Sequence, residues 1–122
     1  MKESFKDYLS HNKQMSFNEI LFSFIDEKGF KDSEVYKKVD IDRKLFSKIR
    51  CSENYIPRKN IIIKLCIALC LTKSEFNKLL NSAGYSLSNT TFDLVISYCI
   101  ENNIYDLNII NNYLYTYTNA VL

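Results

Sequence analysis

The chain has 122 residues, a formal net charge of +2, 47% apolar residues, two Gly and one Pro. This length predicts one domain with a sizeable core and excludes two independent domains. So few helix breakers predict an all-α fold with short loops.

Two features of the sequence bear on location. No apolar run reaches membrane-spanning length, and residues 1–15 carry charges throughout, unlike a secretory signal. We therefore expect a cytoplasmic protein with no membrane partner.

The four cysteines and the one histidine bear on metal binding. The cysteines lack the Cys-x-x-Cys spacing of a zinc knuckle, and His11 has no partner at a ligand spacing. We expect small buried thiols in a reducing compartment and no metal site. The cysteines are Cys51, Cys66, Cys70 and Cys99.

The positive charge is concentrated in one part of the chain. From Val35 to Lys64 there are nine Lys/Arg and three Asp/Glu, a balance of +6, whereas residues 86–122 have three acids and no base, a balance of −3. A cationic segment of this kind suits a phosphate backbone. The alternative, a merely solvated lysine-rich face, stays open.

The first predicted elements lie in residues 1–84. Residues 1–15 are an arm or a short helix. The first secure helix opens at Ser16, which forms a capping box with Glu19, and ends at Gly29. Helices are then expected over 32–39 and 43–51, with Asp32 and Asp42 as N-caps. They are followed by a loop to Pro57, an apolar helix over 60–71 and a helix from Thr72 to 82, again with a capping box.

Two further helices are predicted in residues 85–122, opened by Thr90 and Asp106. Tyr113, Tyr115 and Tyr117 alternate with other residues as in a strand, but the apolar spacing favours a helix. We expect this extension to pack on the core, with its excess of apolar residues forming a surface for a second copy or another protein.

The helices over 32–39 and 43–51 are too short to fold alone. Val35, Val39, Ile41, Phe46 and Ile49 are spaced to lock them together, as in a helix-turn-helix. This packing leaves the outer face of the second helix free to enter a major groove. That face carries Arg43, Lys44, Ser47 and Lys48.

The order of features continues beyond the two short helices. A proline precedes the apolar helix, an Ala-Leu pair ends it, and a threonine caps the next helix; the residues are Pro57, Ala68, Leu69 and Thr72. Over residues 16–81 the chain resembles the Cro/lambda-repressor (XRE) type of helix-turn-helix protein.

The resemblance implies a five-helix helix-turn-helix core over residues 16–84 and a sequence-specific DNA-binding transcriptional regulator, expected to act as a dimer on double-stranded DNA. Base edges would be contacted by Arg43, Lys44, Ser47 and Lys48. Phosphates would be contacted by Lys37, Lys38, Asn54, Tyr55, Arg58 and Lys59.

Three positions depart from the family pattern. Tyr36 replaces a small residue, Asp40 replaces the turn glycine, and Asp32 places an anion where a phosphate ligand is usual. They motivate an alternative, in which a helix-turn-helix adaptor or antitoxin-like protein binds another protein rather than DNA.

No constellation for catalysis is present. Two glycines are too few for a phosphate-binding loop, and Asp40 and Asp42 are accounted for by turn and capping chemistry. We expect no enzyme and no cofactor.

Overall fold

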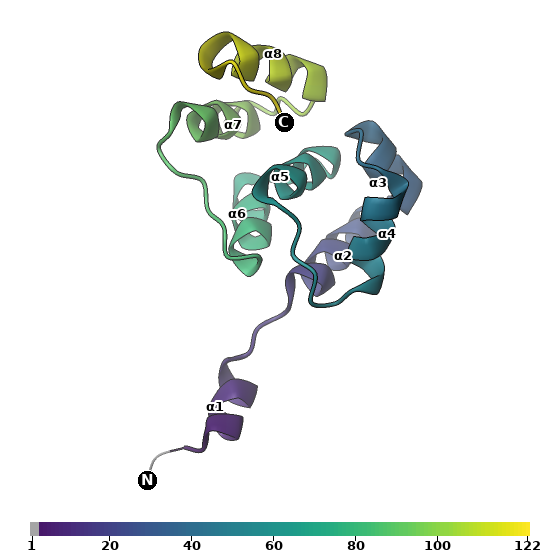
Figure 1. Cartoon of the computed structure of the whole chain (residues 1–122), viewed down its shortest axis with the longest axis vertical. Coiled ribbons are helices and arrows are strands. Elements are labelled where there is room, and N and C mark those ends of the chain that lie inside the picture. The colour runs from purple at the N-terminus through teal and green to yellow at the C-terminus, as the bar shows by residue number, and fades with distance from the viewer. Residues whose placement is uncertain (1–2) are drawn as a thin grey trace.

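The computed structural model describes residues 3–122, and in this range the chain forms eight helices and no strand (Figure 1). The all-α prediction is therefore confirmed. The helices are α1 (Phe5–Asn12), α2 (Phe17–Lys28), α3 (Asp32–Lys38), α4 (Arg43–Cys51), α5 (Lys59–Ala68), α6 (Lys73–Ser82), α7 (Thr91–Glu101) and α8 (Leu107–Thr118). No helix within residues 3–122 is long and apolar enough to cross a bilayer.

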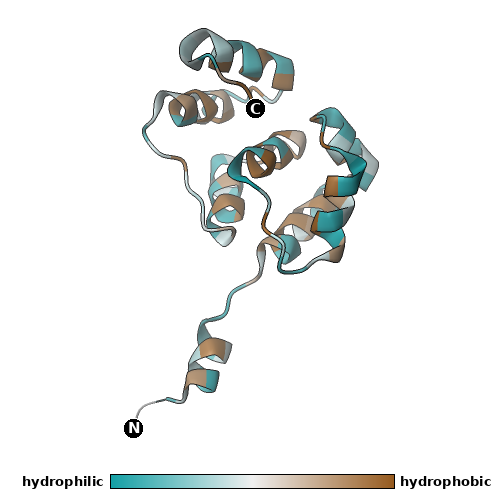
Figure 2. Cartoon of the chain, in the orientation of Figure 1, coloured by the Kyte–Doolittle hydropathy of each residue, from teal (hydrophilic) through white to brown (hydrophobic). Residues whose placement is uncertain are grey.

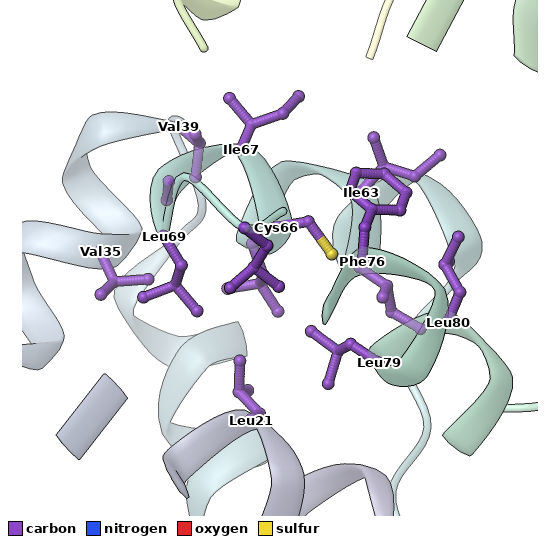
Figure 3. Close-up of a cluster of buried hydrophobic side chains, with 14 of the residues drawn as sticks. Leu21, Val35, Val39, Ile63, Cys66, Ile67, Leu69, Phe76, Leu79 and Leu80 are labelled. Atoms are coloured by element: carbon purple, nitrogen blue, oxygen red, sulfur yellow. The ribbon is translucent and has the colours of Figure 1, made fainter. Parts of the chain in front are cut away.

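Helix α5 lies at the centre of the fold. Six of its ten residues are buried, and α3 and α6 both pack against it. Figure 3 shows Ile63, Cys66 and Ile67 of this helix between side chains of α3 and α6, with Leu21 of α2 below. A helix that is apolar on nearly all sides must be buried on all sides, which explains this position.

The helix starts follow the predicted capping chemistry. Ser16 with Glu19, and Thr72 with Glu75, form complete capping boxes in which each side chain binds the other residue's backbone N–H. The bond from the Thr72 N–H, together with Lys28, lowers the pKa of the Glu75 carboxyl although partial burial opposes this. The local spacing of these residues therefore places both helix starts.

Within residues 3–122, six of the eight helices are followed by a residue with positive φ, and two of these six residues are glycines. Gly29 follows α2 as predicted, but Asp40, Cys70, Asn103 and Asn119 also have positive φ. Cys70 explains why α5 ends at Ala68 and not at the predicted residue 71. Its turn lets the Leu71 N–H donate to the Cys66 carbonyl at 3.1 Å, which closes the helix end.

The extension, residues 85–122, packs on α5 and α6. Helix α7 contacts α6 and pairs with α8, and Ile96, Cys99, Ile110 and Leu114 belong to the same buried cluster as the earlier helices. The helical interpretation of residues 107–118 is confirmed over the strand alternative. Beyond Asn119 the chain runs without regular structure to residue 122.

Polar contacts also join the extension to the core. The Tyr105 hydroxyl donates to the Leu71 carbonyl at 2.6 Å, and Lys73 pairs with Glu101. Lys59 Nζ lies 2.6 Å from a carboxylate oxygen of Asp93, which also accepts bonds from the N–H and hydroxyl of Ser88. The Thr90 hydroxyl accepts a hydrogen bond from the Asp93 N–H and caps α7. The reciprocal bond of a capping box is absent, because the Asp93 carboxylate binds Lys59 and Ser88 instead.

Helix α1 stands apart from the other seven (Figure 1). None of its residues is buried, and residues 13–16 connect it to α2 without regular structure. Its apolar side chains Phe5, Tyr8 and Leu9 are all exposed.

The expectation of four buried thiols is correct for two. Cys66 and Cys99 are buried, and burial raises the pKa of both thiols. Cys51 and Cys70 are exposed, because α4 turns Cys51 outward and α5 ends before Cys70. Within residues 3–122 no three potential ligands gather into a metal site.

Candidate nucleic-acid interface

The candidate interface is built on α3, the turn of residues 39–42 and α4. Val39 and Ile41 of the turn are buried, and Asp40 between them is exposed with φ 54°. The Ile41 N–H donates to the Tyr36 carbonyl at 2.9 Å and closes the end of α3. This geometry reverses the chain within four residues, so that α4 packs against α3.

One face of helix α4 packs into the hydrophobic core. Phe46 and Ile49 are buried, and the ring of Phe46 lies 5.8 Å from that of Phe22 in an edge-to-face arrangement. Tyr36, one of the three departures from the pattern of the resembled family, packs its half-buried ring 5.4 Å from the same Phe46 ring. The large side chain is thus accommodated between α3 and α4 as an additional contact.

The opposite face of α4 carries the four predicted base-contacting residues, and all are exposed: Arg43, Lys44, Ser47 and Lys48. Within residues 3–122 none of them forms an ion pair or a side-chain hydrogen bond. Lys48 Nζ lies 4.3 Å from the centroid of the Tyr55 ring, a cation–π contact that holds it beside the loop of residues 52–58. The face is therefore open to solvent and positively charged.

A hollow of about 380 Å³ lies beside the contact between α3 and α4 and is lined by residues of both helices. Ser33 of α3 and Arg43, Ser47 and Arg50 of α4 contribute to its lining. Ser33 and Arg50 were not among the DNA contacts predicted from the sequence. The spacing of Arg43, Ser47 and Arg50, four and then three residues apart, places them on one helical face and could have identified Arg50. Nothing in the sequence singles out Ser33.

Asp32 does not face solvent as an isolated anion. The sequence predicted Asp32 as the N-cap of α3, but the helix begins at Asp32 and its N-cap is Lys31. The Asp32 carboxylate accepts hydrogen bonds from Nε and a terminal nitrogen of Arg50, each at 2.6 Å. The other expected cap, Asp42, occupies the N-cap position of α4, but its side chain forms no capping bond.

The six predicted phosphate contacts fall into two groups. Lys37, Asn54 and Arg58 are exposed, and Tyr55 is half-buried under Lys48. The other two lysines are engaged within the chain. Lys38 Nζ donates to the Ala68 carbonyl at 3.3 Å and lies 3.6 Å from Cys70 Sγ, while Lys59 pairs with the buried Asp93. We expect these two lysines to hold α3 and α7 in place.

The helices also differ in the hydropathy of their residues. Figure 2 shows many hydrophilic residues in α3 and α4, whereas most of α5 is hydrophobic.

The comparisons with protein families, curated proteins and solved structures find no match to this chain.

Proposed function

We propose that the chain is a sequence-specific duplex DNA-binding transcriptional regulator of the Cro/lambda-repressor helix-turn-helix type, with α2–α6 as its five-helix core. The observation that carries the proposal is the two-sided character of α4. Phe46 and Ile49 bury one face of the helix in the core. The opposite, cationic face is exposed and has no ion-pair partner within residues 3–122; it carries Arg43, Lys44, Ser47 and Lys48.

In this proposal α4 lies in the major groove. Arg43 and Lys44, in its first turn, would reach base edges, with Ser47 and Lys48 one turn further on. An arginine that binds O6 and N7 of a guanine discriminates that base by roughly 1–3 kcal/mol. Lys37, Asn54, Tyr55 and Arg58 would contact phosphates and set the register.

The departures at Asp32, Asp40 and Tyr36 are compatible with this function. Arg50 compensates the charge of Asp32, Asp40 adopts the left-handed conformation of the usual glycine, and Tyr36 packs on Phe46. A protein-binding adaptor or antitoxin-like protein is the second candidate. It is favoured by the exposed Leu94, Tyr98 and Tyr117 on α7 and α8.

The test uses fluorescence anisotropy on the DNA upstream of the protein's own gene, since small repressors often act there. Arg43→Glu and Lys48→Glu should each abolish specific binding with a melting temperature close to that of the wild type, because both side chains are exposed. Lys78→Glu on α6 is the matched control, since it makes the same charge change away from α4 and should bind normally.

Specific binding that survives both α4 changes would refute the assignment of this helix to the groove. A stoichiometric protein partner, captured without salt-sensitive DNA retention, would establish the adaptor alternative instead.

A further inference from the structure

Helix α1 has an apolar stripe that nothing in its own chain covers. Phe5, Tyr8 and Leu9 are three and then one residue apart, which places them on one helical face, and they are 77%, 55% and 49% exposed. An eight-residue helix is marginal in water without packing partners. The stripe therefore has the form of an anchor for an apolar groove.

A groove with the matching character lies between α7 and α8. Its volume is about 390 Å³, and its lining is mostly apolar: Thr91, Leu94, Val95, Tyr98, Tyr113 and Tyr117. Within this lining the Tyr98 and Tyr113 rings meet edge to face at 6.4 Å, and Leu94 is 54% exposed. Aromatic and aliphatic side chains in such a groove favour an amphipathic helix as the occupant.

Helix α1 does not reach the groove of its own chain. The four residues 13–16 between α1 and α2 span at most about 14 Å when fully extended. Figure 1 places α1 at one end of the molecule and α7 and α8 at the other, with α2, α5 and α6 between them. An α1 helix that fills the groove must therefore come from another copy.

The charges of the two segments differ in sign, but most of the acids already have partners. Residues 86–122 hold three acids and no base, whereas residues 1–14 hold three lysines and two acids, a balance of +1. Two of the three acids, Asp93 and Glu101, pair with Lys59 and Lys73 of the core. The apolar stripe of α1 is therefore the main determinant of the proposed docking, and the positive balance of its segment does not oppose it.

We propose that the chain forms a homodimer in which α1 of each copy docks its Phe5–Tyr8–Leu9 stripe in the α7–α8 groove of the other. Reciprocal docking closes the assembly at two copies and uses both unpartnered surfaces. The inference extends the dimer expected of the proposed regulator, but its test does not depend on DNA binding.

The test measures the mass of the full-length chain by sedimentation equilibrium over roughly 1–100 μM. The arm variant carries Phe5→Asp and Leu9→Asp, and the groove variant carries Leu94→Asp and Tyr98→Asp. All four positions are exposed, so both variants should keep the wild-type helical circular dichroism. Tyr115→Asp, an exposed change on α8 outside the groove lining, is the matched control.

We expect a dimeric wild type and control, and a dissociation constant weakened by more than roughly 30-fold in each variant. An equimolar mixture of the two variants should form heterodimers, because the intact arm of the groove variant fits the intact groove of the arm variant.

A monomeric wild type would overturn the proposal. A fully dimeric arm variant would also overturn it, since direct pairing of two α7–α8 faces does not need α1. In either case the anisotropy measurement with the Arg43→Glu and Lys48→Glu variants still tests the role of α4 independently.

Discussion

The Asp32 carboxylate at the start of α3 and the Arg50 guanidinium near the end of α4 are joined by two hydrogen bonds of 2.6 Å. The bond to Asp32 is the main cause of the raised pKa of Arg50. Arg50 also stacks over the Phe22 ring at 4.0 Å, so three helices meet at this guanidinium. The pair cancels one cation of the candidate interface.

Asp32→Asn should therefore strengthen DNA binding. The change removes the anion and releases a full positive charge on Arg50, which should add about one unit to the slope of log affinity against log salt. Because the pair is substantially exposed, the stability should change by less than about 1 kcal/mol. Titrations at several salt concentrations measure both slope and affinity.

Glu101→Gln is the control for this change, since it breaks an exposed ion pair with Lys73 on α6 and α7 instead. Equal effects of Asp32→Asn and Glu101→Gln would show that net charge alone matters and that Arg50 has no place at the interface.

The Lys59–Asp93 pair should make stability depend on acid pH. Burial raises the pKa of Asp93, but the bonds from Lys59 and Ser88 outweigh it, so the net pKa is lowered. A carboxyl with a lower pKa in the folded state stabilises the protein fully above its unfolded pKa near 4, and this stabilisation is lost as the pH falls through the folded value.

Asp93→Asn should lower the free energy of unfolding at pH 7 by about 1–3 kcal/mol, because Lys59 and Ser88 lose a charged acceptor. It should also flatten the decline of stability below about pH 4. Urea denaturation at a series of pH values measures both effects. Glu75, whose pKa is also lowered, should maintain a residual slope in this variant. A slope identical to that of the wild type would contradict the role of Asp93.

Asp40→Gly should stabilise the fold. Asp40 has φ 54°, a conformation that costs residues with a Cβ atom more than it costs glycine. We expect a gain of about 0.5–1 kcal/mol and a melting temperature higher by about 3 °C, measurable by calorimetry. Asp40→Ala retains the Cβ atom and should give no gain, so equal stabilisation by both would point to the lost charge as the cause.

The four thiols should react with a disulfide reagent at two different rates, two of them fast and two of them slow. Cys51 and Cys70 are exposed and should react in the native protein, while the buried Cys66 and Cys99 should react only after unfolding. Burial also raises the pKa of the latter two, which lowers their thiolate fraction at neutral pH. Four equally fast thiols would contradict the packing around α5 and α7.

Local chemistry made much of the helical pattern predictable. Ser16 with Glu19 and Thr72 with Glu75 act within one helical turn, so their spacing in the sequence suffices to locate the helix starts. The buried stripe of Val35, Val39, Ile41, Phe46 and Ile49 was likewise predictable, because apolar periodicity reports which face turns inward.

The partners of charged side chains were not predictable in the same way. Lys38 binds the Ala68 carbonyl and Lys59 binds Asp93, over separations of 30 and 34 residues. Periodicity assigns a lysine to a helical face, but it does not tell which distant group that face meets. Two of the six expected phosphate contacts therefore have intramolecular partners that only the tertiary arrangement reveals.

The hydrogen bond from the Tyr105 hydroxyl to the Leu71 carbonyl has a consequence for how the protein unfolds. The bond joins the loop between α7 and α8 to the turn that follows the central helix α5, beside a continuous buried cluster that runs from α2 to α8. The extension and the core should therefore exchange their slowest amide hydrogens at one common rate. A fragment ending at residue 84 would lose this bond and the buried residues of α7 and α8, so we expect it to refold poorly.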